Sequence, residues 1–213
     1  MVAVAGGLVI DPFAGGSVRG VVAALLGRRY WGCELRPEQV AANVAQAAAI
    51  CPDSPPVWHC GDCREAMSGA PAGDFLFTCP PYGDLERYSD DPRDLSTLDY
   101  PQFVEAYRAA VAAACARLRT DRFACVVVGD FRDSAGHYRN FVGDTVAAFR
   151  AAGLHLYNEA ILVTQVGSLP VRIGKQWKVG RKLGKTHQNV LVFVKGRWRD
   201  AATACEESSA EVA

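Results

Sequence analysis

The chain has 213 residues, of which 50% are apolar and 22% are charged, and these values exclude a disordered or collagen-like protein. A chain of this length can bury roughly seven tenths of its extended surface, so we expect one sizeable core. The 23 basic residues balance the 23 acidic ones. This balance excludes a global positive field for holding nucleic acid, and any charge-driven partner must therefore be bound locally.

Apolar runs bounded by turn residues alternate along the chain with stretches of helical periodicity. Strands are predicted at Leu8–Asp11, Arg29–Glu34, Val57–Cys60, Asp74–Thr78, Phe123–Gly129, His155–Val166 and His187–Val194. Helices are predicted from the first glycine turn to Leu26, from Pro37 to about Ile50, from Tyr100 to about Leu118 and over Asn140–Ala152. This order predicts an α/β fold with a mostly parallel, doubly wound sheet, in a single domain over residues 1–199. The small, acidic residues 200–213 predict a flexible tail.

The eight cysteines are interpreted as reduced thiols, because the chain has neither a signal peptide nor the small size of a disulfide-stapled domain. No apolar run approaches the roughly 20 residues that a membrane helix needs. We therefore expect a cytoplasmic protein without a membrane partner.

Three acids stand where strands of the predicted sheet end: Asp11, Glu34 and Asp62. In a doubly wound sheet the ligand lies beyond these ends, at the point where the strand order reverses. The turn over residues 12–17 carries glycines, which allow a close approach of backbone to ligand. Glu34 is placed to accept from ribose hydroxyls and Asp62 from an adenine amino group. Alternatively, Glu34 caps the helix that begins at Pro37, and Asp62 caps a turn.

The turn Asp-Pro-Phe-Ala-Gly-Gly at residues 11–16, followed by Thr-Cys-Pro-Pro-Tyr at residues 78–82, resembles the paired motifs of the S-adenosylmethionine-dependent DNA amino-methyltransferases. These enzymes methylate adenine N6 or cytosine N4, and the resemblance spans roughly Leu8 to Lys195. It implies a class I methyltransferase (Rossmann-like) fold with a seven-stranded sheet, S-adenosylmethionine as cofactor and DNA as partner. The residues implied to bind the cofactor are Asp11, Pro12, Phe13, Ala14, Gly15, Glu34, Asp62 and Cys63. Those implied to hold the target are Cys79, Pro80, Pro81 and Tyr82.

The chemistry explains why such a motif is useful. An exocyclic amine conjugated with its ring is a poor nucleophile, so fixed acceptors must polarise its hydrogens. The backbone carbonyls near Cys79 and Pro80 can do this, since proline fixes them. Tyr82 offers a face on which a flipped base can stack. The alternative is that Tyr82 fills the core after the strand.

Cys79 departs from the pattern of the family, which usually has aspartate, asparagine or serine before Pro-Pro-Tyr. A thiol is a weak acceptor. Serine at this place is commonly associated with cytosine N4, and the acid or amide with adenine N6. Cys79 therefore leaves the base undecided.

We expect the chain to lack both a cofactor-binding segment before the first strand and a separate recognition domain, and therefore expect loops to recognise the DNA. The best candidate is the loop over residues 168–185, which has no acid and interleaves basic residues with an aromatic one. The alternative is a solvated surface. The candidate nucleic-acid-binding residues are Arg172, Lys175, Trp177, Lys178, Arg181, Lys182 and Lys185.

Other polar residues near the predicted site have weaker assignments. Cys60 and Cys63 lack a second pair at zinc spacing, so no metal is expected. Residues 83–99 form a long irregular connection after the motif, which is a common property of functional segments. Three of its side chains are candidates for closing the site: Asp84, Glu86 and Tyr88. Three more residues, just past the fifth strand, are candidates for bordering the cleft, with no role fixed: Asp130, Arg132 and Asp133.

The predicted function is methyl transfer to an exocyclic amine of a DNA base. One alternative is a methyltransferase for RNA, protein glutamine or a small-molecule amine. Another is a non-catalytic subunit that needs a partner. By analogy alone, an enzyme without its own recognition domain works as a homodimer or within a larger assembly, in a phage or restriction setting.

Overall fold

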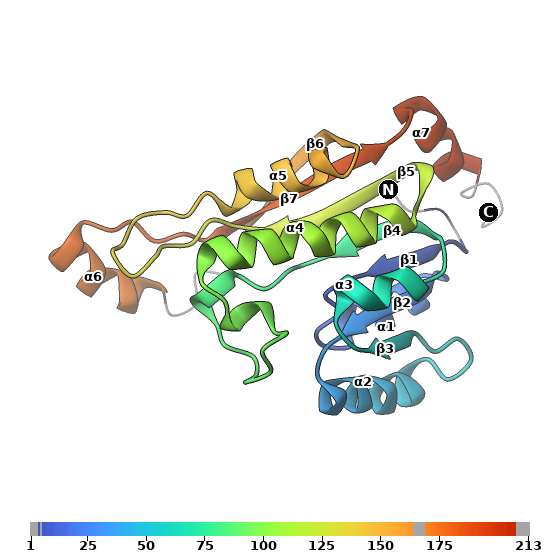
Figure 1. The fold of residues 1–213 in the computed structure, drawn as a ribbon, viewed down its shortest axis with the longest axis horizontal. Coiled ribbons are helices and arrows are strands. Elements are labelled where there is room, and N and C mark those ends of the chain that lie inside the picture. Colours follow the sequence, from blue (N-terminus) through green and yellow to red (C-terminus); the bar gives the residue numbers. More distant parts are fainter. Residues whose placement is uncertain (1–3, 5, 164–168, 208–213) are drawn as a thin grey trace.

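Seven strands form one sheet at the centre of the computed structural model, which describes residue 4, residues 6–163 and residues 169–207 (Figure 1). The strands are β1 (Leu8–Asp11), β2 (Arg29–Glu34), β3 (Val57–Cys60), β4 (Gly73–Thr78), β5 (Leu118–Val128), β6 (Leu154–Val163) and β7 (His187–Lys195). Their order across the sheet is β3-β2-β1-β4-β5-β7-β6. β1 pairs in parallel with both β2 and β4, while β7 runs antiparallel to β5 and β6. The predicted mostly parallel, doubly wound sheet is confirmed, with the order reversing between β1 and β4.

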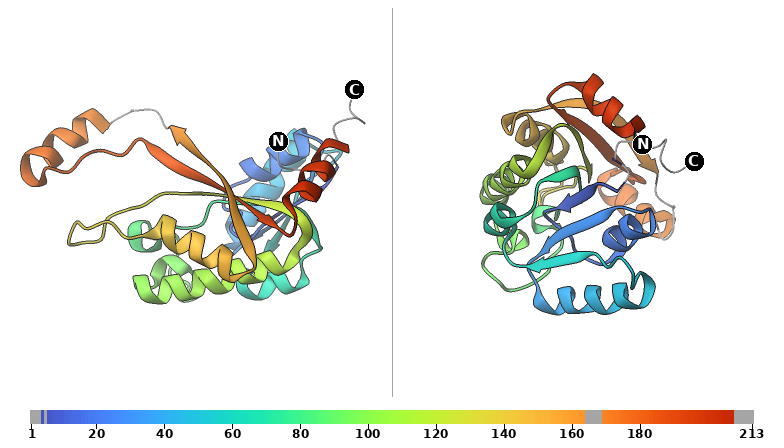
Figure 2. Two further views of the ribbon diagram at one scale, coloured as in Figure 1. Left: turned by 90° about the horizontal axis from the view of Figure 1, so that it is seen from above. Right: turned by 90° about the vertical axis from the view of Figure 1, so that its right-hand side faces the viewer.

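Helices cover both faces of the sheet, as the end-on view in Figure 2 shows. The helices are α1 (Val18–Leu25), α2 (Pro37–Ile50), α3 (Cys63–Ala66), α4 (Tyr100–Arg117), α5 (Phe141–Ala151), α6 (Leu169–Gly180) and α7 (Trp198–Glu207), and of these α6 projects away from the sheet (Figure 1). Short 3-10 turns are η1 (Met67–Gly69), η2 (Gly83–Leu85) and η3 (Leu95–Thr97). No helix in the described part of the chain is long and apolar enough to cross a bilayer.

The core has two parts, one on each face of the sheet, because side chains alternate along a strand. In β4, Leu76 packs with α3, α4 and α5, whereas Phe75 packs on the other face with α1, α2 and α7. In β1 the same alternation places Ile10 in the first part and Val9 in the second. The strands are therefore apolar on both faces, as expected of a covered parallel sheet.

Local signals fix where the helices begin. Pro37 occupies the first turn of α2, where its missing N–H costs nothing. The side chain of Asp99 caps α4 by accepting from the Gln102 amide at 2.9 Å. Asp62 caps α3 in the same way, so the capping alternative raised for Asp62 describes one of its contacts.

Two predicted segments differ in the structure. Residues 200–213 were expected to form a flexible tail, but α7 extends to Glu207 and buries Ala201 completely against the sheet. The alanines favour a helix, and Asp200 in the first turn complements its dipole. The predicted loop over residues 168–185 contains α6, since Pro170 stands where the first turn of a helix tolerates it. Residues 164–168 and 208–213 lie outside the described residues.

Candidate active site

The carboxylate of Asp11, at the end of β1, is completely buried and holds four chain segments together. One oxygen accepts from the Phe13 amide at 3.0 Å and from the Thr78 hydroxyl at 2.6 Å. The other accepts from Arg19 Nε at 2.6 Å and from the Tyr30 hydroxyl at 2.8 Å. The Asp11 carboxylate therefore holds the glycine turn over residues 12–17 in place through these hydrogen bonds.

Arg19 was missed by the sequence reasoning, and it organises the same turn. Besides its ion pair with Asp11, its guanidinium donates to the carbonyl oxygens of Phe13 and Ala14, the latter at 2.9 Å. Burial lowers the pKa of Arg19, but the Asp11 carboxylate outweighs burial and raises it above its ordinary value. The signal was available: a cation in the first turn of a helix opposes the helix dipole and needs a partner.

Glycine and a polar side chain complete the turn. Gly15 has a φ of 54°, a conformation that favours glycine. Its carbonyl accepts from the side-chain amide of Asn43 on α2 at 2.8 Å. The Ala14 amide donates to the Cys33 carbonyl of β2 at 2.8 Å. The turn is thus fixed by contacts from both neighbouring elements.

A cavity of about 610 Å³ opens at the carboxyl ends of β1 to β4. Most of the residues predicted for the site line it: Pro12, Phe13, Gly15, Glu34, Asp62, Cys63, Cys79, Pro80, Pro81 and Tyr82. Asp11 and Ala14, which were expected to contact the cofactor, are fully buried and are not among the lining residues. They do not line the cavity because both side chains point into the protein core beneath the glycine turn.

The two acids at the mouth of the cavity each have an arginine partner. Glu34 accepts from the Arg36 amide at 3.0 Å, and Asp62 accepts from the Arg64 amide at 2.9 Å. Burial raises the pKa of Asp62, but the hydrogen bonds and charge of Arg64 prevail and hold it below its ordinary value. Asp62 is therefore an anion, and the Arg64 guanidinium donates to both of its carboxylate oxygens.

Two thiols face the cavity between these acids. The Cys33 thiol donates to the Gly61 carbonyl at 3.1 Å. Burial raises the pKa of Cys63 to about 12 and that of Cys33 further. Both side chains are neutral and act as small apolar surfaces. Among the described residues no cluster of metal-binding side chains occurs.

Tyr82 belongs both to the cavity and to an aromatic cluster. Its ring centroid lies 6.0 Å from that of Phe131 and 5.7 Å from that of Phe141, both edge-on. Its hydroxyl accepts from the side-chain amide of Gln188 at 2.6 Å. Burial raises the pKa of Tyr82 to about 12, and burial also raises that of Cys79. Both groups are therefore protonated near neutral pH.

Residues 83–99 form a wall of the cavity. Glu86 and Tyr88 line it as expected, and the Tyr88 hydroxyl donates to Glu86 at 2.6 Å. Asp84 instead pairs with Arg139 at 3.1 Å, outside the cavity. Among the lining residues that were not predicted are Arg93, Leu95 and Gln188. Gln188 lies at the polar start of β7, before the apolar run over residues 190–194.

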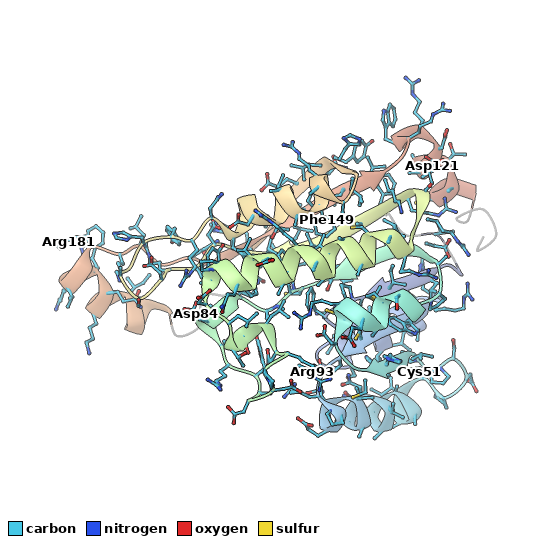
Figure 3. All side chains as sticks on the ribbon, viewed as in Figure 1. Cys51, Asp84, Arg93, Asp121, Phe149 and Arg181 are labelled. Carbon is cyan, nitrogen blue, oxygen red and sulfur yellow. The ribbon has the colours of Figure 1, made fainter. Side chains whose placement is uncertain are left out.

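The predicted basic residues lie away from the cavity, on an arm formed by α6 and the chain up to β7. Figure 3 places Arg181 at the far end of this arm. The Arg181 guanidinium lies 5.5 Å from the ring of Trp177, which is 45% exposed. Lys185 lies nearest the body and donates to the Asp130 carbonyl at 3.3 Å. Lys175, Lys178 and Lys182 also belong to the arm, while the side chain of Arg172 lies outside the described residues.

No protein-family model matches the chain, and no curated protein matches it in sequence. Solved structures do match its fold. TrmN from Thermus thermophilus gives a TM-score of 0.58 at 16% identity, over 90% of this chain and 44% of that one. The chain thus spans less than half the length of TrmN.

Two further structures match over more of their own length. Magnesium protoporphyrin IX methyltransferase (ChlM) from Synechocystis PCC 6803, with bound SAH, gives a TM-score of 0.60 at 11% identity, over 90% of this chain and 75% of that one. A TehB-like SAM-dependent methyltransferase from Corynebacterium glutamicum gives a TM-score of 0.52 at 18% identity, over 90% of this chain and 81% of that one.

The strand order, the antiparallel β7 and these matches define the fold. The chain has the Rossmann-like fold of the class I methyltransferases, with its cavity where such a fold places a ligand. The fold predicted from the sequence is confirmed.

Proposed function

We propose that this protein transfers a methyl group from S-adenosylmethionine to an exocyclic amino group of a DNA base, adenine N6 or cytosine N4. One observation carries the proposal. The glycine turn after β1 and the Cys79–Tyr82 motif after β4 face one cavity. A hydrogen bond from Thr78 to Asp11, which are 67 positions apart in the sequence, joins the two segments.

The residues of the cavity fit the proposed cofactor. A volume of about 610 Å³ lies within the range of cofactor pockets. Glu34 and Asp62 supply anionic acceptors, while Cys63 and Phe13 supply apolar surface. Gly15 and Pro12 bring the backbone of the glycine turn to the wall of the cavity. When bound, S-adenosylmethionine supplies an electrophilic methyl group, and these residues would hold it.

The motif after β4 can orient the acceptor. Pro80 and Pro81 fix the backbone there, so the carbonyls of Cys79 and Pro80 are preorganised to accept from an amino group. Tyr82 offers a ring held in place by its aromatic neighbours and Gln188. Cys79 and Tyr82 do not act as bases, because their raised pKa values keep them protonated. The catalytic contribution is therefore alignment and desolvation.

The arm suits the phosphate backbone of a nucleic acid. Its cations with described side chains are Lys175, Lys178, Arg181, Lys182 and Lys185. Cations beside an exposed tryptophan form the combination that nucleic-acid surfaces use. This supports DNA as the partner although the net charge of the chain is zero.

The test is incubation with tritiated S-adenosylmethionine and mixed-sequence DNA, both duplex and single-stranded, followed by mass spectrometry of the nucleosides. We expect N6-methyldeoxyadenosine or N4-methyldeoxycytidine to form, and Tyr82→Ala to abolish it. Tyr157→Ala is the matched control, since Tyr157 lies on β6 and does not line the cavity. Parallel reactions with RNA, a glutamine peptide and free nucleosides distinguish the other acceptors. Cofactor binding without methylation of any of them would contradict the proposal and favour a subunit that needs a partner.

A further inference from the structure

Residues 131–139, here called the hairpin loop, connect β5 to α5 and project past the sheet. Figure 1 and the left view of Figure 2 place the hairpin loop at the same end of the molecule as the α6 arm. The two segments make contact: a Cβ atom on Gly136 would lie 2.7 Å from Lys182 Nζ. The loop therefore forms a second projection beside the arm.

Hydrogen bonds fix the hairpin loop, although it lies on the surface. The Asp133 amide donates to the His137 carbonyl at 2.9 Å, and the His137 amide donates to the Asp133 carboxylate at 2.8 Å. The Arg139 amide donates to the Phe131 carbonyl at 2.8 Å. A loop with its own network has a defined shape before any partner binds, and this lowers the entropy cost of binding.

This shape displays one aromatic ring. Tyr138 is 51% exposed, and the guanidinium of Arg132 lies over its ring at 3.9 Å from the centroid. The guanidinium is itself held by a hydrogen bond to the Gly136 carbonyl at 2.8 Å. A cation and an aromatic ring stacked in this way form a rigid platform whose exposed surface is available to another flat ring.

The base of the hairpin loop adjoins the acceptor end of the cavity. Phe131 meets Tyr82 edge-on at 6.0 Å. Arg139 pairs with Asp84, two residues beyond Tyr82, and lies 4.4 Å from the ring of Tyr100. The base of the loop therefore lies beside Tyr82, on which the proposed target base would stack.

The charge around the platform suits a polyanion. The loop contributes Arg132 and Arg139, and the arm adds Lys182 and Lys185 beside it. The loop's one acid, Asp133, is engaged by backbone amides, which hold its pKa below the ordinary value against burial. Cations that track phosphates together with an exposed ring favour a strand whose bases are free to stack.

We propose that the Tyr138–Arg132 pair is a stacking site for an unpaired base of a DNA strand, next to the base presented to Tyr82. The inference rests on the proposed function and adds to it a second base-binding position, which favours single-stranded or locally opened DNA over intact duplex.

The test uses the full chain and a short oligothymidylate that carries one central 2-aminopurine, whose fluorescence falls when it stacks. No S-adenosylmethionine is added, so binding is measured independently of methyl transfer. We expect Tyr138→Ala to weaken binding of this strand by about tenfold and to remove the quenching, because base stacking contributes roughly 1–3 kcal/mol. Tyr138→Phe should retain both, and binding of a fully paired duplex should change by less than about twofold.

The matched control is Trp198→Ala on α7, at the opposite end of the molecule (Figure 1). Trp198 is 48% exposed and has Arg199 over its ring at 5.0 Å, so it is the same kind of pair in a different place. This variant should bind the strand as the wild type does. Unchanged melting temperatures would show that both variants are folded.

The outcomes separate this inference from the proposed function. If the wild type methylates DNA and Tyr138→Ala binds the single strand equally well, the stacking site is refuted and the enzymatic proposal survives. Equal losses for single strand and duplex would also refute a site for unpaired bases. If the wild type binds neither strand nor duplex, both proposals fail together.

Discussion

The side-chain amide of Gln188 donates a hydrogen bond of 2.6 Å to the hydroxyl of Tyr82, joining the start of β7 to the motif after β4. The two residues are 106 positions apart, and both line the cavity. The bond fixes the hydroxyl end of the Tyr82 side chain, while Phe131 and Phe141 pack edge-on against its ring. Gln188 is therefore a positioning residue for the proposed acceptor site.

Replacing Gln188 by leucine should lower kcat/KM for methyl transfer by about tenfold, the equivalent of one buried hydrogen bond. The same change should raise the pKa of Tyr82 beyond about 12, because burial raises that pKa and the bond from Gln188 opposes it. Ultraviolet titration of the tyrosinate absorbance measures the shift. In a Tyr82→Phe background, Gln188→Leu should have no further effect on kcat/KM, and an additive loss would show that Gln188 acts elsewhere.

A second prediction concerns the packing beneath the glycine turn. Gly32 on β2 has no space for a side chain, since a Cβ would lie 2.7 Å from the Tyr30 ring and hydroxyl and 2.8 Å from the Ala14 Cβ. Gly32→Ala should displace the Tyr30 hydroxyl from Asp11, destabilise the protein by about 1–3 kcal/mol and weaken cofactor binding. Urea unfolding and cofactor titration measure the two effects.

Gly69→Ala is the control for this prediction. A Cβ at Gly69 would meet nothing within 4 Å. Its free energy of unfolding should stay within about 0.5 kcal/mol of the wild type. Equal stability of the two variants would mean that the tight packing around Gly32 has no energetic consequence.

The sheet was predictable because its signals are local. Short apolar runs such as those in Leu8–Asp11 and Asp74–Thr78 need no distant partner to indicate a strand, and consecutive prolines at 80 and 81 end one unambiguously. The convergence of the turn and the motif on one cavity followed from the rule for carboxyl ends of parallel strands. These parts of the site depend on chain order alone.

Contacts across the fold were not predictable from the sequence. The role of Gln188 arises from a partner 106 positions away, which only the assembled sheet brings near. Asp11 carried the expected chemistry, but four donors turn its carboxylate away from the cavity. The helical α6 and α7 were missed because polar composition was interpreted as loop, while burial of Ala201 depends on the neighbouring strands.

The pH dependence of stability should reveal the ion pair at the mouth of the cavity. The pKa of Asp62 is below its ordinary value because hydrogen bonds from Arg64 outweigh burial. A group with a lowered folded pKa stabilises the protein above its unfolded pKa, and this stabilisation is lost as the pH falls through the folded value. The wild type should therefore exceed Asp62→Asn in stability at pH 7, with the difference shrinking below about pH 4.

Urea midpoints at a series of pH values measure this difference. Arg64→Gln removes the partner and should abolish most of the same pH-dependent gain, whereas Arg87→Gln, on an exposed pair far from Asp62, should leave it intact. A difference that grows as the pH falls would contradict the assignment of sign.

Salt dependence should identify the arm as a phosphate-binding element. Each cation that neutralises a phosphate contributes about 0.9 to the slope of log affinity against log salt. Arg181→Gln with Lys182→Gln should therefore reduce the slope for duplex DNA by about two. Arg197→Gln with Arg199→Gln, two exposed positions beside or on α7, is the matched charge control. Equal slopes for the wild type and the arm variant would remove these two residues from the interface.

Cys79 is the clearest departure from the motif that the chain resembles, and its substitution tests whether the side chain or the backbone orients the acceptor. Burial raises the pKa of the thiol, so it is neutral and a weak acceptor at pH 7 to 8. If the backbone carbonyls do most of the work, Cys79→Ala should lower kcat only about two- to threefold, less than one full hydrogen bond. Cys79→Asp should raise kcat, because a carboxylate adds a strong acceptor beside the amine.

Single-turnover rates with saturating DNA measure both variants without interference from product release. The rates of wild type and Cys79→Ala should have the same pH dependence from pH 7 to 8, because burial raises the pKa of the thiol and keeps it protonated there. Identical rates in wild type, alanine and aspartate variants would remove the side chain from the mechanism. A loss of more than about a hundredfold in Cys79→Ala would instead assign the acceptor role to the thiol, because a truncation that costs this much exceeds the loss of a single neutral hydrogen bond.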